Sequence, residues 1–212
     1  MQKIWLVKTS EIPSFFTKEK LLKKLPKSMW YRANRYLDNE SSTAYIIGRL
    51  LLKKALVDKG VSVSILEDIY YTKHGKPCLK ELQFSISHSK GYVILVFGTA
   101  SSVGIDIEKK ENIDLGLFQY LFREDEWKHI MEATDSLTTF YWYWVRKEAL
   151  LKAAGASLKE LKLLDVFEDY GCYKRKLYYF TTFEFDTAFS GVMAMEKREA
   201  TALEILTIDD LV

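Results

Sequence analysis

Two long stretches of the chain place apolar residues at the spacing of an α-helix. Over residues 41–60, isoleucine, leucine and alanine recur every three or four positions between a serine pair, Ser41 and Ser42, and a final glycine. Over residues 137–155, aromatic residues are followed by good helix formers and again by a glycine. Serine caps the start of a helix and glycine adopts the left-handed conformation that ends one, so both stretches are predicted helices.

Shorter segments are rich in β-branched and aromatic residues and are bounded by turn residues, as strands are. The sequence predicts strands at residues 2–7, 64–72, 82–89, 92–98, 103–108, 161–168, 173–184, 190–196 and 203–206. Ser-Lys-Gly at 89–91 predicts a hairpin, and Gly171 predicts a later turn. Two short helices separated by Pro26 are expected within 17–37, and another helix within 123–132.

The order helix, strand and hairpin occurs twice, around residues 41–98 and again around 137–196. This repetition predicts an α+β fold with two related halves and mainly antiparallel sheets. We expect an N-terminal half over residues 1–101 and a C-terminal half over residues 102–212.

The composition indicates a globular protein whose attraction for phosphates is local. The 212 residues are 48% apolar, enough for the core of one large or two small domains. The 31 basic residues nearly balance the 29 acidic ones, which argues against a nucleic-acid-binding protein. Cys78 and Cys172 form neither a disulfide framework nor a zinc pattern, and no stretch approaches the roughly 20 apolar residues of a membrane span. We expect a cytoplasmic protein that binds neither nucleic acid nor membrane.

Two carboxylates fall on one face of the predicted strand 103–108. Side chains alternate along a strand, so Asp106 and Glu108 point to one side and the large apolar residues to the other. Neighbouring like charges are tolerated in solvent or around a cation, and carboxylate oxygens suit Mg²⁺. An ordinary half-exposed strand is the alternative interpretation.

On the predicted helix 137–155, Trp144, Glu148 and Lys152 are spaced by four residues and therefore share one stripe. A carboxylate and an ammonium lie one turn apart there. The alternative is a surface ion pair worth about 0.3–0.5 kcal/mol, with Trp144 packed in the core.

Two donors to phosphate occur in the N-terminal half. Lys76 lies in the rigid turn Gly75-Lys76-Pro77, and His88 follows Ser85-Ile-Ser87 at the end of a predicted strand. An ammonium and an imidazole can each donate hydrogen bonds to phosphate oxygens. The alternatives are a generic surface turn and a capped strand end.

Four motifs follow one another along the chain: Gly75-Lys76-Pro77, Ser85-Ile-Ser87-His88-Ser89, Val103-Gly-Ile-Asp106-Ile-Glu108 and Trp144-Val-Arg-Lys147-Glu148-Ala-Leu-Leu-Lys152. Together they resemble the 4'-phosphopantetheinyl transferase family, in its larger, monomeric, surfactin-synthetase-activating type. The last motif, W-x-x-K-E-x-x-x-K, is the most specific. The resemblance implies the fold of that family, two similar α/β halves in a pseudo-twofold arrangement, with coenzyme A and Mg²⁺ in the cleft between them.

The resemblance also implies roles for residues of this sequence. The metal would be bound by three carboxylates, Asp106, Glu108 and Glu148. Coenzyme A would be held by Lys76, Pro77, Ser87, His88 and Lys152. The catalytic residues would be Glu148, Lys152 and His88.

The implied reaction is Mg²⁺-dependent. The serine of an acyl or peptidyl carrier protein attacks the pantetheine-side phosphate of coenzyme A, and 3',5'-adenosine bisphosphate leaves. As a hypothesis, Glu148 or a metal-bound water accepts the serine proton.

One position departs from the pattern of this type. An arginine that binds the adenosine 3'-phosphate often precedes the glycine of the first long helix by four residues, and this chain has Ala44 there. Candidate substitutes are Arg49, Lys73, Arg32 and Arg35.

The carrier protein is expected to contact residues 111–130, a polar stretch with interspersed leucines and phenylalanines. The alternative is that these apolar residues pack into the core. Lys109, Lys110 and Lys128 would steer an acidic carrier.

Two other functions remain open from the sequence alone. A Mg²⁺-dependent hydrolase of nucleotide pyrophosphates would release adenosine bisphosphate without any carrier. A non-catalytic carrier-binding module would bind carriers without Mg²⁺-dependent turnover.

Overall fold

The structure, a computed structural model, describes residues 2–80, 82–99 and 101–212. The chain folds as two compact units, each described by itself: unit 1 comprises Met1–Ala100 and Glu199–Val212, and unit 2 comprises Ser101–Arg198. Residues 1, 81 and 100 of the predicted N-terminal half lie outside the described residues. Helices and sheets occur in both units, so the fold is α+β, as predicted.

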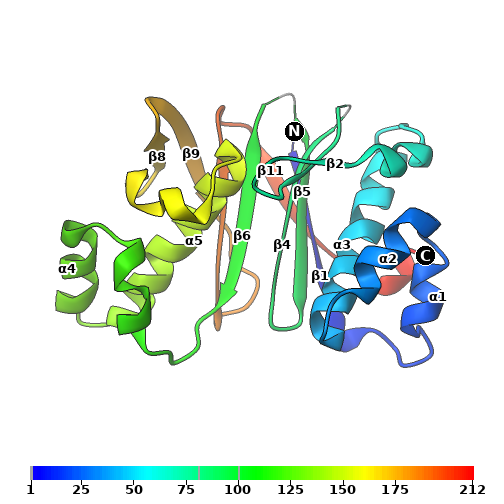
Figure 1. Cartoon of the computed structure of the whole chain (residues 1–212), viewed down its shortest axis with the longest axis horizontal. Helices are drawn as coiled ribbons and strands as arrows, with labels where there is room; N and C mark the ends of the chain where they lie inside the picture. Colours follow the sequence, from blue (N-terminus) through cyan, green and yellow to red (C-terminus); the bar gives the residue numbers. More distant parts are fainter. Residues whose placement is uncertain (1, 81, 100) are drawn as a thin grey trace. The chain divides into compact units, whose positions relative to one another are not determined.

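Unit 1 is built on a four-stranded sheet in the order β11, β1, β5, β4 (Figure 1). Its strands are β1 (Gln2–Lys8), β4 (Gln83–Ser89), β5 (Tyr92–Thr99) and β11 (Thr201–Leu206). β1 is parallel to β11 and antiparallel to β5, and β5 forms the predicted hairpin with β4. Lys90 and Gly91 make the turn of this hairpin, with positive φ angles of 37° and 84°.

Helix α3 (Asn39–Asp58) lies against this sheet and supplies much of the core of unit 1. It begins before the predicted serine pair because the carboxylate of Asp38 accepts a hydrogen bond from the backbone N–H of Ser41 at 2.6 Å. At Gly48 the helix approaches β4 so closely that an added Cβ would meet the side chain of Ile86 at 3.2 Å.

Two short helices, α1 (Lys18–Leu22) and α2 (Trp30–Asn34), flank Pro26 as predicted. Their apolar side chains, among them Leu21 and Leu22, join the same core as α3.

A small hairpin of β2 (Tyr70–Tyr71) and β3 (Pro77–Cys78) stands apart from the main sheet of unit 1. The prediction of one strand over residues 64–72 is wrong for most of its length, because Val63–Asp68 form a 3₁₀ helix, η3, and only β2 is a strand. The hydroxyl of Ser62 caps this helix by accepting a hydrogen bond from the N–H of Ser64.

Unit 2 contains a five-stranded sheet in the order β6, β10, β9, β8, β7, with every neighbouring pair antiparallel. Its strands are β6 (Val103–Lys109), β7 (Asp165–Val166), β8 (Tyr170–Tyr173), β9 (Lys176–Thr182) and β10 (Phe189–Met195). Helix α5 (Ser136–Ala154) packs on β6 and β10, beside the shorter α4 (Glu124–Glu132). It ends at Gly155 with a φ of +64°, as predicted. No helix among the described residues is long and apolar enough to cross a membrane.

The predicted strand 161–168 is mostly wrong, because its first three residues are helical and only two of its residues form a strand. Leu158–Leu163 form a 3₁₀ helix, η5, because Ser157 and Glu160 build a capping box at its start, and only the two residues of β7 are extended. A further 3₁₀ helix, η4 (Leu115–Leu121), occupies part of the stretch that the sequence leaves irregular.

The turn between β8 and β9 lies at Lys174 and Arg175, which have positive φ angles, and not at the predicted Gly171. Gly171 belongs to β8, where an added Cβ would approach the Leu150 side chain to 2.8 Å and the Phe180 ring to 2.9 Å. Close packing, not a turn, therefore requires this glycine.

The final strand, β11, forms close to where it is predicted but belongs to unit 1. Its pairing runs from Gln2 opposite Thr201 to Val7 opposite Leu206. The sequence assigns residues 199–212 to the second half because a local pattern of apolar residues does not reveal which distant strand a segment will join.

Gly104 on β6 sets the spacing between the sheet and the long helix of unit 2. An added Cβ would lie 2.0 Å from the backbone oxygen of Ala149 and 2.3 Å from the backbone nitrogen of Ala153, both on α5. The backbones of β6 and α5 are therefore in contact, which only glycine permits at this position.

We predict that Gly104→Ala lowers the free energy of unfolding by about 3 kcal/mol, because the clash involves backbone atoms that no rotamer change can move. Denaturant unfolding of the variant and the wild type measures this difference. Gly48→Ala is the matched control, and its effect should be small because it meets only a flexible side chain. Equal stability of Gly104→Ala and wild type would contradict the assigned role of Gly104.

Candidate active site

Asp106 and Glu108 lie on the face of β6 that α5 covers. Side chains alternate along the strand, so both carboxylates share the face of Gly104, which touches the helix backbone. Asp106 is buried, with a relative exposure of 2%, and Glu108 is half-buried near the end of the strand. The predicted pairing of these carboxylates on one face is therefore present, on a largely buried strand.

Lys152 connects α5 to β6 through an ion pair. Its Nζ lies 2.6 Å from Oδ1 of Asp106, and the Lys152 side chain is only 28% exposed. The alternative of an ordinary surface pair with Glu148 does not describe this arrangement, because the partner of Lys152 is a buried carboxylate on a strand.

Glu148 completes a group of three carboxylates around this one ammonium. Burial raises the pKa of the Glu148 carboxyl to about 7; the Lys152 ammonium acts against this rise, and the charges of Asp106 and Glu108 add to it. Burial alone would lower the pKa of Lys152, but the attraction of Asp106 and Glu148 outweighs it, so that pKa is raised. All three carboxylates therefore act electrostatically on the ammonium of Lys152.

The donor set fits a hard divalent cation in chemistry and in charge. Asp106, Glu108 and Glu148 offer only carboxylate oxygens, which Mg²⁺ prefers, and their mutual repulsion would be relieved by a positive ion. Within the described ranges, no three side chains of histidine, cysteine, aspartate or glutamate are already gathered as a set of metal ligands. The ammonium of Lys152 is the cation that Asp106 contacts in the structure.

Lys147, next to Glu148 in the same motif, has a structural role that the sequence interpretation did not assign. It is completely buried, and its Nζ lies 2.9 Å from Oε2 of Glu126 on α4. It also donates to the backbone oxygens of Leu161 at 2.9 Å and Leu164 at 3.4 Å. These three acceptors use all three donors of the ammonium, so Lys147 fixes α5 against α4 and η5. The only sequence signal for this residue was its place in the W-x-x-K-E motif.

Trp144 is half-buried and packs against the core of unit 2, in which one of the sequence interpretations placed it. Its ring is stacked on Phe140 with centroids 5.8 Å apart and contacts Phe118 and Phe122 edge-on or tilted. The aromatic residues of η4 and α5 therefore support the segment of helix that carries Glu148.

In unit 1, the predicted phosphate donors lie on neighbouring elements. The Gly75-Lys76-Pro77 turn joins β2 to β3, with a φ of +84° at Gly75 and a hydrogen bond from the N–H of Thr72 to the oxygen of Lys76. Ser87 is buried and His88 is exposed on β4, which β3 contacts.

Ala44 and His88 line the same small hollow in unit 1. Among the candidate substitutes, Arg49 is buried, with its guanidinium 5.0 Å from the ring of Tyr45, and it donates to the hydroxyl of Tyr71 at 3.4 Å. Arg32 is exposed and stacks over the ring of Tyr71 at 4.1 Å.

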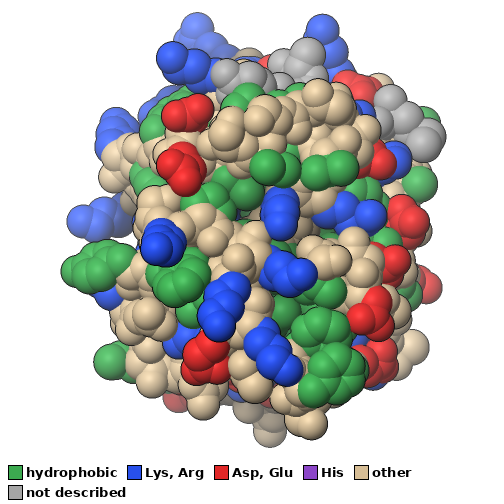
Figure 2. Space-filling view, turned by 90° about the vertical axis from the view of Figure 1, so that its right-hand side faces the viewer, with side chains coloured by type: hydrophobic (Ala, Val, Ile, Leu, Met, Phe, Trp, Pro, Cys, Tyr) green, Lys and Arg blue, Asp and Glu red, His purple; other side chains and the backbone are tan. Residues whose placement is uncertain are grey.

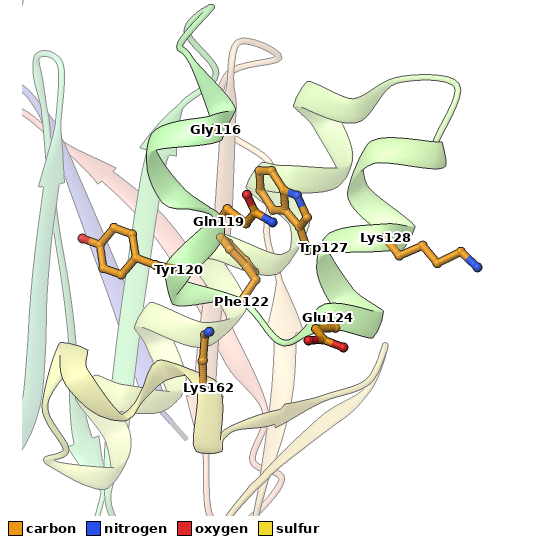
Figure 3. Close-up of a pocket in the computed structure, with 8 residues that line it drawn as sticks. All are labelled: Gly116, Gln119, Tyr120, Phe122, Glu124, Trp127, Lys128 and Lys162. Atoms are coloured by element: carbon orange, nitrogen blue, oxygen red, sulfur yellow. The ribbon is translucent and has the colours of Figure 1, made fainter.

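A hollow of about 600 Å³ opens among η4, α4 and η5 of unit 2 (Figure 3). The residues that line it are Gly116, Gln119, Tyr120, Phe122, Glu124, Trp127, Lys128 and Lys162. Lys162 points toward the side formed by Tyr120 and Phe122, whereas Lys128 points away. In the predicted carrier-binding stretch 111–130, Phe122 is part of the core, but Leu117 and Tyr120 are 68% and 69% exposed. Phe122 therefore packs into the core, as one sequence interpretation held, whereas contact of the exposed Leu117 and Tyr120 with a carrier stays a prediction.

Comparison with known proteins agrees with the motifs. Residues 102–195 match the 4'-phosphopantetheinyl transferase superfamily. A 4'-phosphopantetheinyl transferase of Aneurinibacillus migulanus is 30% identical over 129 residues, which cover 58% of this chain and 53% of that protein. One of Bacillus subtilis is 30% identical over 137 residues, covering 60% of this chain and 58% of that protein.

The chain is similar over a longer segment to the L-aminoadipate-semialdehyde dehydrogenase-phosphopantetheinyl transferase of Schizosaccharomyces pombe. The two are 29% identical over 180 residues, which cover 74% of this chain and 66% of that protein. The chain thus spans between about half and two thirds of the length of these curated relatives. The matched segment, residues 102–195, contains the three carboxylates and Lys152 on β6 and α5, so this part of the chain is similar to the 4'-phosphopantetheinyl transferase superfamily.

Proposed function

We propose that the protein transfers the 4'-phosphopantetheine group of coenzyme A to a serine of an acyl or peptidyl carrier protein. The observation on which this proposal depends is the group of buried Asp106 and half-buried Glu108, Glu148 and Lys152 within the segment that matches the superfamily. Several relatives carry the name of this activity. In this proposal the protein acts in the cytoplasm, on a carrier protein there, and it acts as a monomer.

In this proposal, Asp106, Glu108 and Glu148 bind Mg²⁺, which when bound supplies positive charge to the pyrophosphate of coenzyme A. The carboxylate oxygens of this group support the assignment. Lys152 donates to a phosphate oxygen of coenzyme A, since an ammonium is a compact charge on a helix held firmly against β6.

One phosphorus–oxygen bond forms in the reaction and another breaks. The serine oxygen of the carrier bonds to the pantetheine-side phosphorus, the bond from that phosphorus to the bridging oxygen breaks, and 3',5'-adenosine bisphosphate leaves with the bridging oxygen. In this proposal Glu148 takes the serine proton, because it is one of the carboxylates gathered around the reacting groups.

The residues of unit 1 bind the rest of coenzyme A in this proposal. Lys76 and Pro77 lie in a turn fixed by Gly75, and Ser87 and His88 lie on the adjacent strand β4. Their backbone is held by regular pairing, which suits residues that must orient a phosphate.

The carrier docks on the outer side of η4 in this proposal, where Leu117 and Tyr120 are exposed and Tyr120 lines the hollow in Figure 3. Exposed apolar side chains beside a concave surface are typical of protein contact sites.

Incubation with an apo-carrier protein, coenzyme A and Mg²⁺ should add the mass of one phosphopantetheine group to the carrier, as measured by mass spectrometry. Asp106→Asn should slow this transfer by about 100-fold or more, because it removes a proposed metal ligand. A chelator should abolish it. Cleavage of coenzyme A without modification of any carrier would contradict transfer and favour the hydrolase.

Thermal unfolding tests the cation site independently of activity. Mg²⁺ should stabilise the wild type by roughly 2.7 kcal/mol when its concentration is 100 times Kd, and should have little effect on Glu148→Gln. Without Mg²⁺, Glu148→Gln should be at least as stable as the wild type, because it removes a charge buried beside Asp106 and Glu108. Equal stabilisation of both proteins by Mg²⁺ would rule out Glu148 as a ligand.

Leu117→Glu should raise KM for the carrier about tenfold, while kcat and KM for coenzyme A stay unchanged, because it places a charge in the proposed apolar contact. Steady-state kinetics with varied carrier measure this effect. The control is Leu177→Glu, which alters a comparably exposed leucine on β9. The same KM in both variants would disprove docking at η4.

A further inference from the structure

Unit 2 contains a buried ion pair for which the proposed reaction has no direct use. Lys and Arg side chains stand at the surface on the face of the molecule in Figure 2, as such charges usually do. Lys147 of α5, by contrast, is completely buried, and its partner Glu126 on α4 is only 2% exposed. A buried pair of this kind is costly to keep and costly to break, so its place in the unit calls for an explanation.

Glu126 is fixed between the start of α4 and the middle of α5. Its Oε2 accepts a hydrogen bond from Nζ of Lys147 at 2.9 Å and another from the backbone N–H of Arg123 at 3.0 Å. The other two acceptors of Lys147 are backbone oxygens of Leu161 and Leu164. Glu126 is therefore the side-chain partner that holds this ammonium, and the one that a substitution can remove.

Lys147 transmits the position of Glu126 to the proposed active site. Glu148 follows Lys147 directly in the same helix, so a shift that carries Lys147 toward or away from α4 also moves Glu148. A displacement of about 1 Å in a reacting group can cost a factor of about 100 in rate. The pair thus decides where Glu148 stands relative to the carboxylates of β6.

The backbone connects Glu126 to η4 as well. η4 ends at Leu121, Phe122 follows it, and Arg123 is the residue that caps α4. The N–H group that holds Glu126 belongs to Arg123, so it lies two residues after the end of η4. A contact that restrains η4 therefore also restrains the carboxylate of Glu126.

Phe122 connects the hollow of unit 2 to the buried ammonium. Its ring lines the hollow in Figure 3, and Nζ of Lys147 lies 5.8 Å from the centroid of that ring. Trp127, which lines the hollow too, has its ring centroid 6.0 Å from that of Phe122. Because packed interiors transmit displacement, a group that presses on these rings acts on Lys147.

We propose that Glu126 is a positioning residue that holds Glu148, through Lys147, where the serine and Mg²⁺ require it. A carrier protein docked at η4 restrains Glu126 further, because it fixes Phe122 and the start of α4. The proposal rests on the proposed function, since it takes the carrier as the partner at η4 and Mg²⁺ as the ion at Glu148. It adds that carrier and Mg²⁺ strengthen the binding of each other, because coupling between two sites is reciprocal.

Isothermal titration calorimetry tests this coupling without any transfer. The Kd of Mg²⁺ is measured with and without a saturating carrier whose acceptor serine is replaced by alanine. The carrier should lower this Kd about tenfold in the wild type and leave it unchanged in Glu126→Gln. The control, Glu196→Gln, makes the same change at a carboxylate that pairs with Lys176 of β9, and it should keep the coupling of the wild type.

Transfer kinetics separate positioning from a merely structural role. Glu126→Gln should lower kcat by about 10- to 100-fold with little change in KM for coenzyme A, whose proposed contacts are mostly in unit 1. Glu126→Gln combined with Lys147→Met leaves no unpaired buried charge, so thermal unfolding should show it to be more stable than the single variant. Its kcat should stay low, whereas a merely structural role predicts that kcat recovers together with stability.

The proposal is overturned if the carrier does not change the Kd of Mg²⁺ in the wild type, if Mg²⁺ does not bind, or if Glu126→Gln keeps the coupling. Recovery of kcat in the double variant overturns it too. Transfer by the wild type without any coupling would leave the proposed function standing and remove this proposal. Coupled binding of carrier and Mg²⁺ without transfer would do the opposite.

Discussion

The contact between α5 and β6 determines whether unit 2 can hold its charged group. Gly104 lets the backbone of the helix reach the strand, and the ion pair of Lys152 with Asp106 forms only across this short separation. On another side of the helix, Lys147 is bound to Glu126 and to two backbone oxygens. These contacts on two sides fix both the rotation of α5 about its own axis and its distance from β6. Glu148 is therefore kept near the carboxylates of β6.

This arrangement stores unfavourable electrostatic energy where chemistry is proposed. A carboxyl with a pKa of about 7 is more easily neutral than charged in its surroundings, which costs stability when it ionises. The aromatic packing of Phe118, Phe122, Phe140 and Trp144 offsets this cost with a large apolar core. Functional sites commonly hold such strain within an otherwise well-packed unit.

Local patterns in the sequence were enough to predict both long helices, the hairpin of β4 and β5, and the shared face of Asp106 and Glu108. The predictions failed where a single polar side chain decides the local structure, as Ser62 does for η3 and Ser157 for η5. They also missed what depends on residues far apart in sequence. The partner of Lys152 is 46 positions away and that of Lys147 is 21 positions away, so no pattern within one helix reveals either.

The parallel pairing of β1 with β11 affects how the protein is made. Unit 2 is one continuous segment, whereas unit 1 is assembled from two segments with unit 2 between them. During synthesis, β1 and β5 can pair early, but the other edge of β1 has no strand beside it until β11 leaves the ribosome. Exposed strand edges promote association between chains. Unit 2 can therefore complete its fold first, and the time needed to translate it sets how long the nascent unit 1 is open to aggregation.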